Sequence, residues 1–348
     1  MITYIGIIKE ISHLFLLLFL LEVNSLVIAY TVLIIIVIAV LLVVYTPYIS
    51  SALVKKLFEG GVAIEPENYE EIQSKTKQIE NVRYSSSYAS NELDVISPKV
   101  IKEPLPIILW IHGGAFVAGD KSDITEYAVQ IAAHGYHVVN INYALAPKDK
   151  YPTPLLQLND AYRWIMKHAD DYQFDTTKLI IAGDSAGAQI VSQYALVQTN
   201  EEYAKKLQID PIISKETIVG LLLYCGPYDI KQLSHLSDNK LVSFLLNRVG
   251  WGYIGERKWQ TSETASLASP IDFITTDYPA SFITDGNVMT FDEHGKALVA
   301  KLKKLNVPVT EKFYEGNGLP HEYQFMMNTP EAFKTFEATI QFLKKVTK

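Results

Sequence analysis

Cysteine is almost absent from this chain of 348 residues, and positive charge is in the minority. The one cysteine, Cys225, excludes an internal disulfide, and its place in the apolar run 221–225 predicts a buried structural thiol. The net charge is −7, from 31 Lys and Arg residues against 38 Asp and Glu residues. Because no basic stripe interleaved with aromatic residues accompanies this acidic balance, the sequence predicts no nucleic-acid partner.

Charge of either sign is missing from one long stretch near the N-terminus. Residues 26–45 contain no charged side chain and consist mainly of Ile, Val and Leu. A helix of this length crosses the roughly 30 Å hydrocarbon core of a bilayer. A signal peptide would have a shorter apolar part and a small-residue cleavage site after it. The sequence therefore predicts a membrane anchor within residues 1–50.

Two arrangements of this anchor are open. A second apolar run, 11–21, together with residues 2–8 makes a further span and so a helical hairpin, or else it forms an interfacial lead to a single span. In the hairpin, Lys9 and the pair Lys55 and Lys56 lie on the same side, and the positive-inside rule places the large domain in the cytoplasm. The single span favours the same orientation by one lysine.

A polar linker, expected over 51–78, leads to a globular domain, expected over 79–348. Within the linker, residues 59–77 are either an extended connection or a short amphipathic helix. In this domain apolar runs of strand length alternate with helical patterns. This alternation predicts an α/β fold, with a mostly parallel eight-stranded sheet and helices on both faces. The expected strands are 81–87, 93–96, 106–111, 137–143, 178–182, 219–224, 280–284 and 307–314, and the expected helices are 124–133, 155–168, 186–197, 292–305 and 330–346.

A strand, a Gly-x-Ser-x-Gly turn and a helix follow one another around Ser185. The turn runs from Gly183 to Gly187, directly after the apolar run 178–182 and at the start of the helical pattern 186–197. Such a turn lifts the serine oxygen above the sheet, and the flanking glycines let the backbone bend without a Cβ clash. The pattern predicts that Ser185 is a nucleophile.

A second glycine-containing turn, beginning His112-Gly113-Gly114, directly follows the apolar run 106–111. Acyl transfer needs hydrogen-bond donors aimed at the oxyanion that forms when a serine attacks a carbonyl. The backbone N–H groups of Gly113 and Gly114, together with that of Ala186, are expected to form this oxyanion hole. His112 is expected to hold the loop in shape rather than to act as a base.

With these turns in place, residues from about 79 to 345 resemble the hormone-sensitive-lipase-like esterases, a family of α/β-hydrolases. The resemblance implies the α/β-hydrolase fold, an ester substrate, and a cap between strands 6 and 7, at about residues 228–270. One departure is Ala115, where the family usually has a third glycine. The resemblance rests on six blocks: 112–116, 143–147, 158–164, 183–187, 268–270 and 320–321.

His321 is the expected general base. A serine hydrolase of this fold takes its catalytic residues in the chain order Ser, acid, His. Of the histidines that follow Ser185, His235 falls in the expected cap and His294 in an expected helix, whereas His321 lies in a loop after the last strand. An imidazole there takes the serine proton and passes it to the leaving group.

The catalytic acid is not evident, because the family position for it is occupied by Met289. Asp285 is the preferred candidate, since it ends a strand and is followed by a flexible Gly-Asn pair. Asp292 or Glu293, at the start of the next helix, and Asp229, after the preceding strand, are alternatives, as is the absence of any acid.

Taken together, these features predict a membrane-anchored serine carboxylic-ester hydrolase. The resemblance implies short- to medium-chain acyl esters or a membrane-linked acetylated molecule as substrates. The ester is expected to be hydrolysed through an acyl-enzyme without a metal or an organic cofactor, and the expected partners are the small ester and the lipid bilayer. A peptidase or amidase on the same fold is one alternative. A non-catalytic membrane-bound protein that kept the fold is another.

Overall fold

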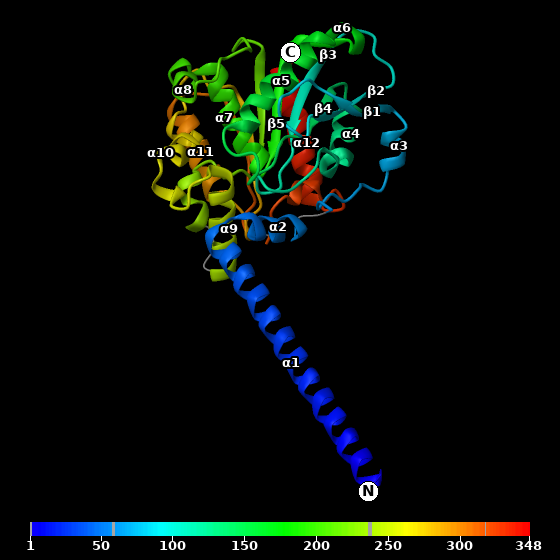
Figure 1. Cartoon of the computed structure of the whole chain (residues 1–348). Coiled ribbons are helices and arrows are strands. Elements are labelled where there is room, and N and C mark those ends of the chain that lie inside the picture. The colour runs from blue at the N-terminus through cyan, green and yellow to red at the C-terminus, as the bar shows by residue number, and fades with distance from the viewer. Residues whose placement is uncertain (1, 58–59, 236–238, 317) are drawn as a thin grey trace. The chain divides into compact units, whose positions relative to one another are not determined.

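The computed structural model describes residues 2–57, 60–235, 239–316 and 318–348. Parts of the expected anchor, linker, cap and His321 loop (residues 1, 58–59, 236–238 and 317) lie outside the described residues. The chain divides into two units, Met1–Ile49 and Ser50–Lys348. The first is helical, and the second contains the whole sheet (Figure 1).

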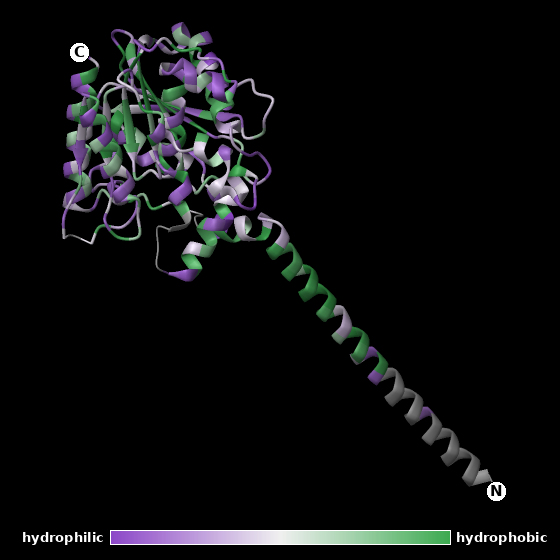
Figure 2. Ribbon diagram, turned by 90° about the vertical axis from the view of Figure 1, so that its left-hand side faces the viewer, coloured by the Kyte–Doolittle hydropathy of each residue, from purple (hydrophilic) through white to green (hydrophobic). Residues whose placement is uncertain are grey.

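The first unit consists almost entirely of one helix, α1 (Ile2–Tyr45). Its stretch Glu22–Tyr45 has 24 residues and a mean hydropathy of 3.4, so it is long and apolar enough to cross a membrane by length and composition. Figure 2 shows this stretch in the hydrophobic colour. Of the two expected anchor arrangements, the hairpin differs from the structure, because no turn interrupts the helix within residues 2–45.

The sheet of the second unit has eight strands in the order β1-β2-β4-β3-β5-β6-β7-β8. The pairs β1–β2 and β2–β4 are antiparallel and the other five pairs are parallel. The expected mostly parallel eight-stranded sheet is therefore confirmed. The strands are β1 (Thr76–Arg83), β2 (Glu92–Pro98), β3 (Leu105–Ile111), β4 (His137–Ile141), β5 (Phe174–Asp184), β6 (Ile218–Tyr224), β7 (Ser281–Thr284) and β8 (Val309–Lys312).

Helices cover both faces of the sheet, because alternate side chains of each buried strand point to opposite sides. In β3, Leu109 and Ile111 belong to one apolar cluster, whereas Ile108 and Trp110 belong to the other. The first cluster contains side chains of α5 (Thr153–Lys167), α7 (Ala186–Thr199) and α11 (Asp292–Lys304), and the second contains those of α4 (Thr125–Ala132) and α12 (Pro330–Val346).

The segment expected as a linker is more ordered than its polarity indicated. It contains most of α2 (Tyr48–Leu57) and all of α3 (Tyr69–Gln73), and β1 already begins at Thr76. Tyr69 is buried in the cluster on the α4 face. The sequence allowed a linker or a short amphipathic helix over residues 59–77, and α3 lies in this range.

The segment between β6 and β7 forms the cap expected at about 228–270. Its longest element is α9 (Lys240–Ile254). The Asn239 side chain caps the start of this helix by accepting from Leu241 N, and Gly255 follows its end in the left-handed conformation. Besides α9, shorter helices lie in the connecting segments: α6 (Ala169–Tyr172), α8 (Glu201–Leu207) and α10 (Glu263–Leu267).

Candidate active site

Ser185 lies on the tight turn between β5 and α7. Its backbone has φ +51° and ψ −119°, a strained conformation for a residue with a side chain. The turn is fixed from outside, because Ser185 N donates to Tyr224 O on β6 at 2.8 Å. It also packs closely on β3, where a Cβ at Gly187 would overlap the Ile111 carbonyl oxygen. The predicted strand, turn and helix are therefore all present.

His321 reaches Ser185 from a loop between β8 and α12. Its Nε2 lies 2.9 Å from Ser185 Oγ, although 136 positions separate the two residues in the chain. This distance is within the hydrogen-bonding range in which an imidazole accepts a hydroxyl proton. The structure thus brings together the two residues that the sequence proposed as nucleophile and base.

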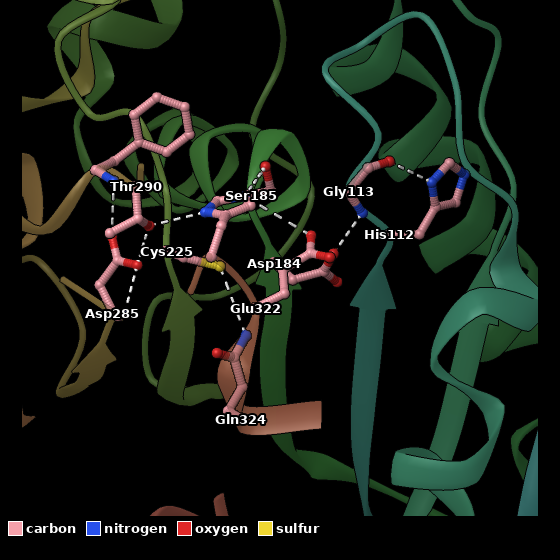
Figure 3. Close-up of polar contacts among 12 residues, drawn as sticks. His112, Gly113, Asp184, Ser185, Cys225, Asp285, Thr290, Glu322 and Gln324 are labelled. Carbon is pink, nitrogen blue, oxygen red and sulfur yellow. Dashed lines mark hydrogen bonds and ion pairs between the residues drawn. The ribbon is translucent and has the colours of Figure 1, made fainter. Parts of the chain in front are cut away.

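Thr290 lies between His321 and Asp285, an arrangement the sequence interpretation missed (Figure 3). Thr290 Oγ1 is 2.8 Å from His321 Nδ1 and donates a short hydrogen bond to Asp285 Oδ1. Asp285 is buried at the end of β7, where it also accepts from Gly286 N at 2.7 Å and from Phe291 N at 3.1 Å. The carboxylate therefore meets the imidazole through a hydroxyl rather than directly.

The hydrogen bonds of this chain have a consistent direction. Because the Thr290 hydroxyl donates its only proton to Asp285, its oxygen accepts from the N–H at His321 Nδ1. That tautomer leaves a lone pair on Nε2, which faces the Ser185 hydroxyl. The arrangement orients the ring as a directly bonded acid would, with one hydroxyl added.

The other expected acids have different partners. Asp292 and Glu293 both pair with Lys296, at 2.7 and 3.0 Å. Asp229 accepts from Ser269 Oγ at 3.2 Å. Met289, at the family position for the acid, is 78% exposed. Asp285 is the one of the four carboxylates to which a described hydrogen-bond chain from His321 leads.

The structure uses the Gly113 N–H differently from the sequence expectation. This group donates to Asp184 Oδ2 at 2.7 Å, so Gly113 is not available to an oxyanion. Within the described part of the chain, no hydrogen bond engages the N–H groups of Gly114, Ala115 and Ala186. The expectation for Gly114 and Ala186 is thus compatible with the structure, and the Ala115 N–H is a further donor without a described partner.

His112 holds the loop in shape, as the sequence indicated. Its Nδ1 lies 2.7 Å from Gly113 O, and its ring stacks on Tyr143 with 4.5 Å between the centroids. The Tyr143 hydroxyl donates to His112 O at 3.1 Å. Burial lowers the pKa of His112 to about 4, so the ring is neutral at pH 7.

A pair of carboxyl groups, the buried Asp184 and the partly buried Glu322, lies beside the nucleophile (Figure 3). Asp184 accepts from Trp110 Nε1 at 2.8 Å in addition to Gly113 N, and burial raises its pKa to about 7. Burial, and then the negative charge of Asp184, raise the pKa of Glu322 well above its ordinary value. Glu322 therefore keeps its proton at pH 7 and donates it to Asp184.

The reacting groups themselves have shifted pKa values. Burial lowers the pKa of His321 to about 4 and raises that of Asp285 to about 7. The base is consequently neutral, and able to accept a proton, throughout the physiological range.

Two cavities meet at His321. One has a volume of about 360 Å³, and its walls are apolar side chains of α2, α9 and the loop after β7, with Ser185, Ala186 and His321 at its base. The other has a volume of about 220 Å³ and includes Asp184 and Glu322 in its walls. The first suits an acyl chain, and the second is more polar.

One group of side chains has atoms close enough to share a metal ion. Cys225, His321 and Glu322 offer ligand atoms within 4.8 Å of one another. Their chemistry does not suit a cation, because burial raises the pKa of Cys225 well above its ordinary value and Glu322 is also protonated. Both ring nitrogens of His321 already have partners.

Comparison with known proteins gives one family match. The BD-FAE family model matches residues 93–294, a segment that includes β2 to β7, Ser185 and Asp285. His321 lies beyond the matched segment.

Two known proteins are similar to this chain in sequence. An α/β-hydrolase of Acanthamoeba polyphaga mimivirus is 24% identical over 268 residues, which cover 73% of this chain and 72% of that protein. Esterase LipC of Mycobacterium tuberculosis is 28% identical over 187 residues, which cover 53% of this chain and 44% of that esterase. The chain thus spans less than half of the length of the second relative.

The fold also matches solved structures. Esterase B from Lactobacillus rhamnosis superposes with a TM-score of 0.69 at 19% identity, over 86% of this chain and 92% of that one. The likeness confirms the α/β-hydrolase architecture.

Proposed function

Because the chain belongs to the BD-FAE family, we propose that it is a serine carboxylic-ester hydrolase with Ser185 as nucleophile and His321 as general base. The observation that carries this proposal is the 2.9 Å contact between His321 Nε2 and Ser185 Oγ on the strained turn. A scaffold without catalysis has no need for a strained serine that faces a neutral imidazole.

The reaction begins when Ser185 Oγ attacks the ester carbonyl carbon and its proton passes to His321 Nε2. The carbonyl π electrons move to the oxygen, which becomes an oxyanion that receives hydrogen bonds from Gly114, Ala115 and Ala186 N–H. Collapse of this intermediate expels the alkoxide, which takes the proton from His321. Water then attacks the acyl-enzyme by the same route and releases the acid and free Ser185.

Asp285 acts on His321 through Thr290 in this proposal. The imidazole gains a positive charge when it takes the serine proton, and the buried carboxylate stabilises that charge through the intervening hydroxyl. The same hydrogen bonds hold the ring in the productive tautomer. Asp285 is thus the preferred acid, and Thr290 is a positioning residue.

The apolar cavity supports esters with short- to medium-chain acyl groups as substrates. Its volume of about 360 Å³ lies at the small end of the range for ligand pockets, roughly 300–1,000 Å³. Its wall contains Phe116, Leu245 and Val249, which suit methylene groups rather than a peptide. The second cavity, which is more polar than the first, holds the alcohol part of the ester.

Residues 22–45 support a membrane anchor, with the catalytic unit on the cytoplasmic side. Residues 26–45 of this stretch carry no charge, and Lys55 and Lys56 follow it closely, against Lys9 before it. Protease digestion of sealed right-side-out and inverted vesicles tests this orientation. Cleavage of the catalytic unit only in inverted vesicles is expected.

Active-site labelling tests the proposed function directly. A fluorophosphonate probe is expected to label the wild-type protein and not Ser185→Ala, and Ser185→Ala is expected to lose at least about 10³-fold in kcat on p-nitrophenyl butyrate. Ser192→Ala, at a buried serine on α7 that contacts Tyr278, is the matched control. Hydrolysis by Ser185→Ala at the wild-type rate would refute the proposal. Faster turnover of a matched peptide or anilide would instead indicate an amidase.

A further inference from the structure

The mouth of the apolar cavity has an exposed hydrophobic border. Met289 is 78% exposed although it also lines the cavity, and Phe244, on the outer side of α9, is 46% exposed. We define the apolar rim as the exposed residues Leu53, Leu57, Leu241, Phe244, Val288 and Met289. A large exposed apolar patch beside a ligand cavity is a feature of surfaces that contact a partner or a membrane.

The rim is built on elements that form the cavity itself. Val54 and Leu57 of α2 line the cavity, as do Val242 and Leu245 of α9. Arg248 Nε lies 3.3 Å from Ser50 Oγ and links the two helices, which lie side by side in Figure 1. Each helix thus presents one apolar side to the cavity and a second apolar side to the exterior.

The charges of these helices are all of one sign. Residues 50–57 and 240–254 contain Lys55, Lys56, Lys240 and Arg248 and no Asp or Glu, in a chain whose net charge is −7. The Arg248 guanidinium lies 4.3 Å from the centroid of the Trp251 ring. The Arg248 side chain is itself buried, so the exposed charges of the two helices are Lys55, Lys56 and Lys240. Exposed lysines beside apolar side chains are typical of segments that lie in the headgroup region of a bilayer.

The sequence itself limits how far the rim lies from a bilayer. Only Thr46 and Pro47 separate the end of the apolar stretch 22–45 from the start of α2 at Tyr48. Two residues span at most about 7 Å. A chain anchored by this stretch therefore begins α2 at the membrane surface.

We propose that the apolar rim docks on the surface of an anionic bilayer, so that ester substrates enter the apolar cavity from the lipid rather than from water. The proposal rests on the esterase function and the membrane anchor proposed above. A lipid-dissolved acyl ester then moves from one apolar environment into another without exposing its chain to solvent. Lysine side chains around the rim contact the anionic headgroups.

Fluorescence quenching tests the contact. The full-length protein is reconstituted in vesicles of phosphatidylcholine with about 30% phosphatidylserine, which gives them an anionic surface. It is labelled with an environment-sensitive fluorophore at Phe244→Cys or at Phe333→Cys. Phe333 is a matched control, because it is 52% exposed and lies on α12. Quenching by spin-labelled lipid is expected at position 244 and not at position 333. Equal quenching at both positions, or none at 244, would overturn the proposal.

Kinetics test the route of the substrate. Phe244→Asp is expected to lower hydrolysis of a long-chain ester dissolved in the vesicles by at least about tenfold and to leave hydrolysis of water-soluble p-nitrophenyl butyrate within about twofold. Phe333→Asp is expected to change neither rate. Equal loss of both activities in Phe244→Asp would mean that the rim serves only to maintain the fold.

Different results would refute the esterase function and the docking surface. If wild-type protein hydrolyses neither ester, the esterase function is wrong. If it hydrolyses both and Phe244→Asp behaves like wild type, only the docking surface is wrong. A disulfide-linked dimer of Phe244→Cys in vesicles, without lipid quenching, would assign the rim to a second copy of the chain and overturn the lipid contact.

Discussion

At the scale of single residues, the contact that most affects the chemistry is the Thr290 hydroxyl between Asp285 and His321. It extends the distance over which the carboxylate acts, and it makes the orientation of the imidazole depend on two hydrogen bonds. A side chain of the same shape without a hydroxyl would break both bonds and leave the volume almost unchanged.

Thr290→Val is expected to lower kcat/KM on p-nitrophenyl butyrate by roughly 10- to 100-fold, because the ring loses its acceptor at Nδ1 and Asp285 loses its link to the ring. Thr290→Ser keeps the hydroxyl and is expected to remain within about threefold of wild type. Steady-state kinetics of the two variants measure the difference. If Thr290→Val and Thr290→Ser were equally active, the hydroxyl would have no role in positioning.

The pH dependence of kcat/KM is expected to report Asp285 rather than His321. The pKa of His321 is about 4, so this base is neutral well below pH 7, whereas the pKa of Asp285 is raised to about 7. As pH falls through 7, Asp285 takes up a proton and stops stabilising the imidazolium, so activity falls.

Asp285→Asn is expected to remove this rise in kcat/KM around pH 7 and to be slower by at least about 100-fold above it. Asp292→Asn, at an exposed pair with Lys296, is the control and should keep the wild-type profile. If kcat/KM of Asp285→Asn still rose at the same pH, the rise would come from titration of the Asp184 and Glu322 pair instead.

The sequence identified Ser185 and His321 because each lies in a local pattern tied to a strand end. It preferred Asp285 as the acid, and the structure connects Asp285 to His321 through Thr290, a residue that the sequence interpretation missed. A hydroxyl one position after Met289 was the available signal, but its role depends on the bend of the loop after β7. The expected donor Gly113 failed for a related reason, since the Asp184 contact that engages its N–H joins positions 71 residues apart.

At the scale of elements, the turn from β5 to α7 depends on the close approach of its backbone to β3. Seven of the expected strands and the five expected helices match elements of the structure, because their apolar residues recur at the expected period. The first strand was misplaced, since its expected range 81–87 shares only residues 81–83 with β1. Helix α2 was not predicted, and α3 lies within residues 59–77, where a linker or a short amphipathic helix was expected.

Gly187→Ala is expected to lower the Tm of the protein by roughly 6 °C or more, because the added Cβ would overlap the Ile111 carbonyl oxygen. Gly220→Ala in β6 is the matched control, since its Cβ would lie 3.2 Å from the movable Phe342 side chain. Differential scanning fluorimetry measures both. Equal Tm values for the two variants would mean that the backbone of the turn relaxes without cost.

At the scale of the whole molecule, the anchor proposed for the apolar stretch of α1 would hold the esterase at a membrane. The double variant Ile35→Lys/Ile36→Lys places two lysines at the middle of this stretch. Each of them raises the free energy of membrane insertion by roughly 2.5–3.5 kcal/mol, whereas a lysine at Val27, near the end of the stretch, raises it less. The double variant is expected to leave the membrane fraction after alkaline carbonate extraction, and Val27→Lys to stay in it. Retention of the double variant would show that the stretch is not the anchor.

The Thr290 hydroxyl also makes the resting state of the enzyme depend on one proton. If Asp285 is protonated, its O–H points at Thr290, the threonine proton swings towards Nδ1, and the ring must carry its hydrogen on Nε2. That hydrogen then faces Ser185, and the imidazole has no lone pair left for the serine. The hydrogen bonds through the Thr290 hydroxyl can therefore run in either direction. Protonation of Asp285 reverses them and leaves Ser185 without a base.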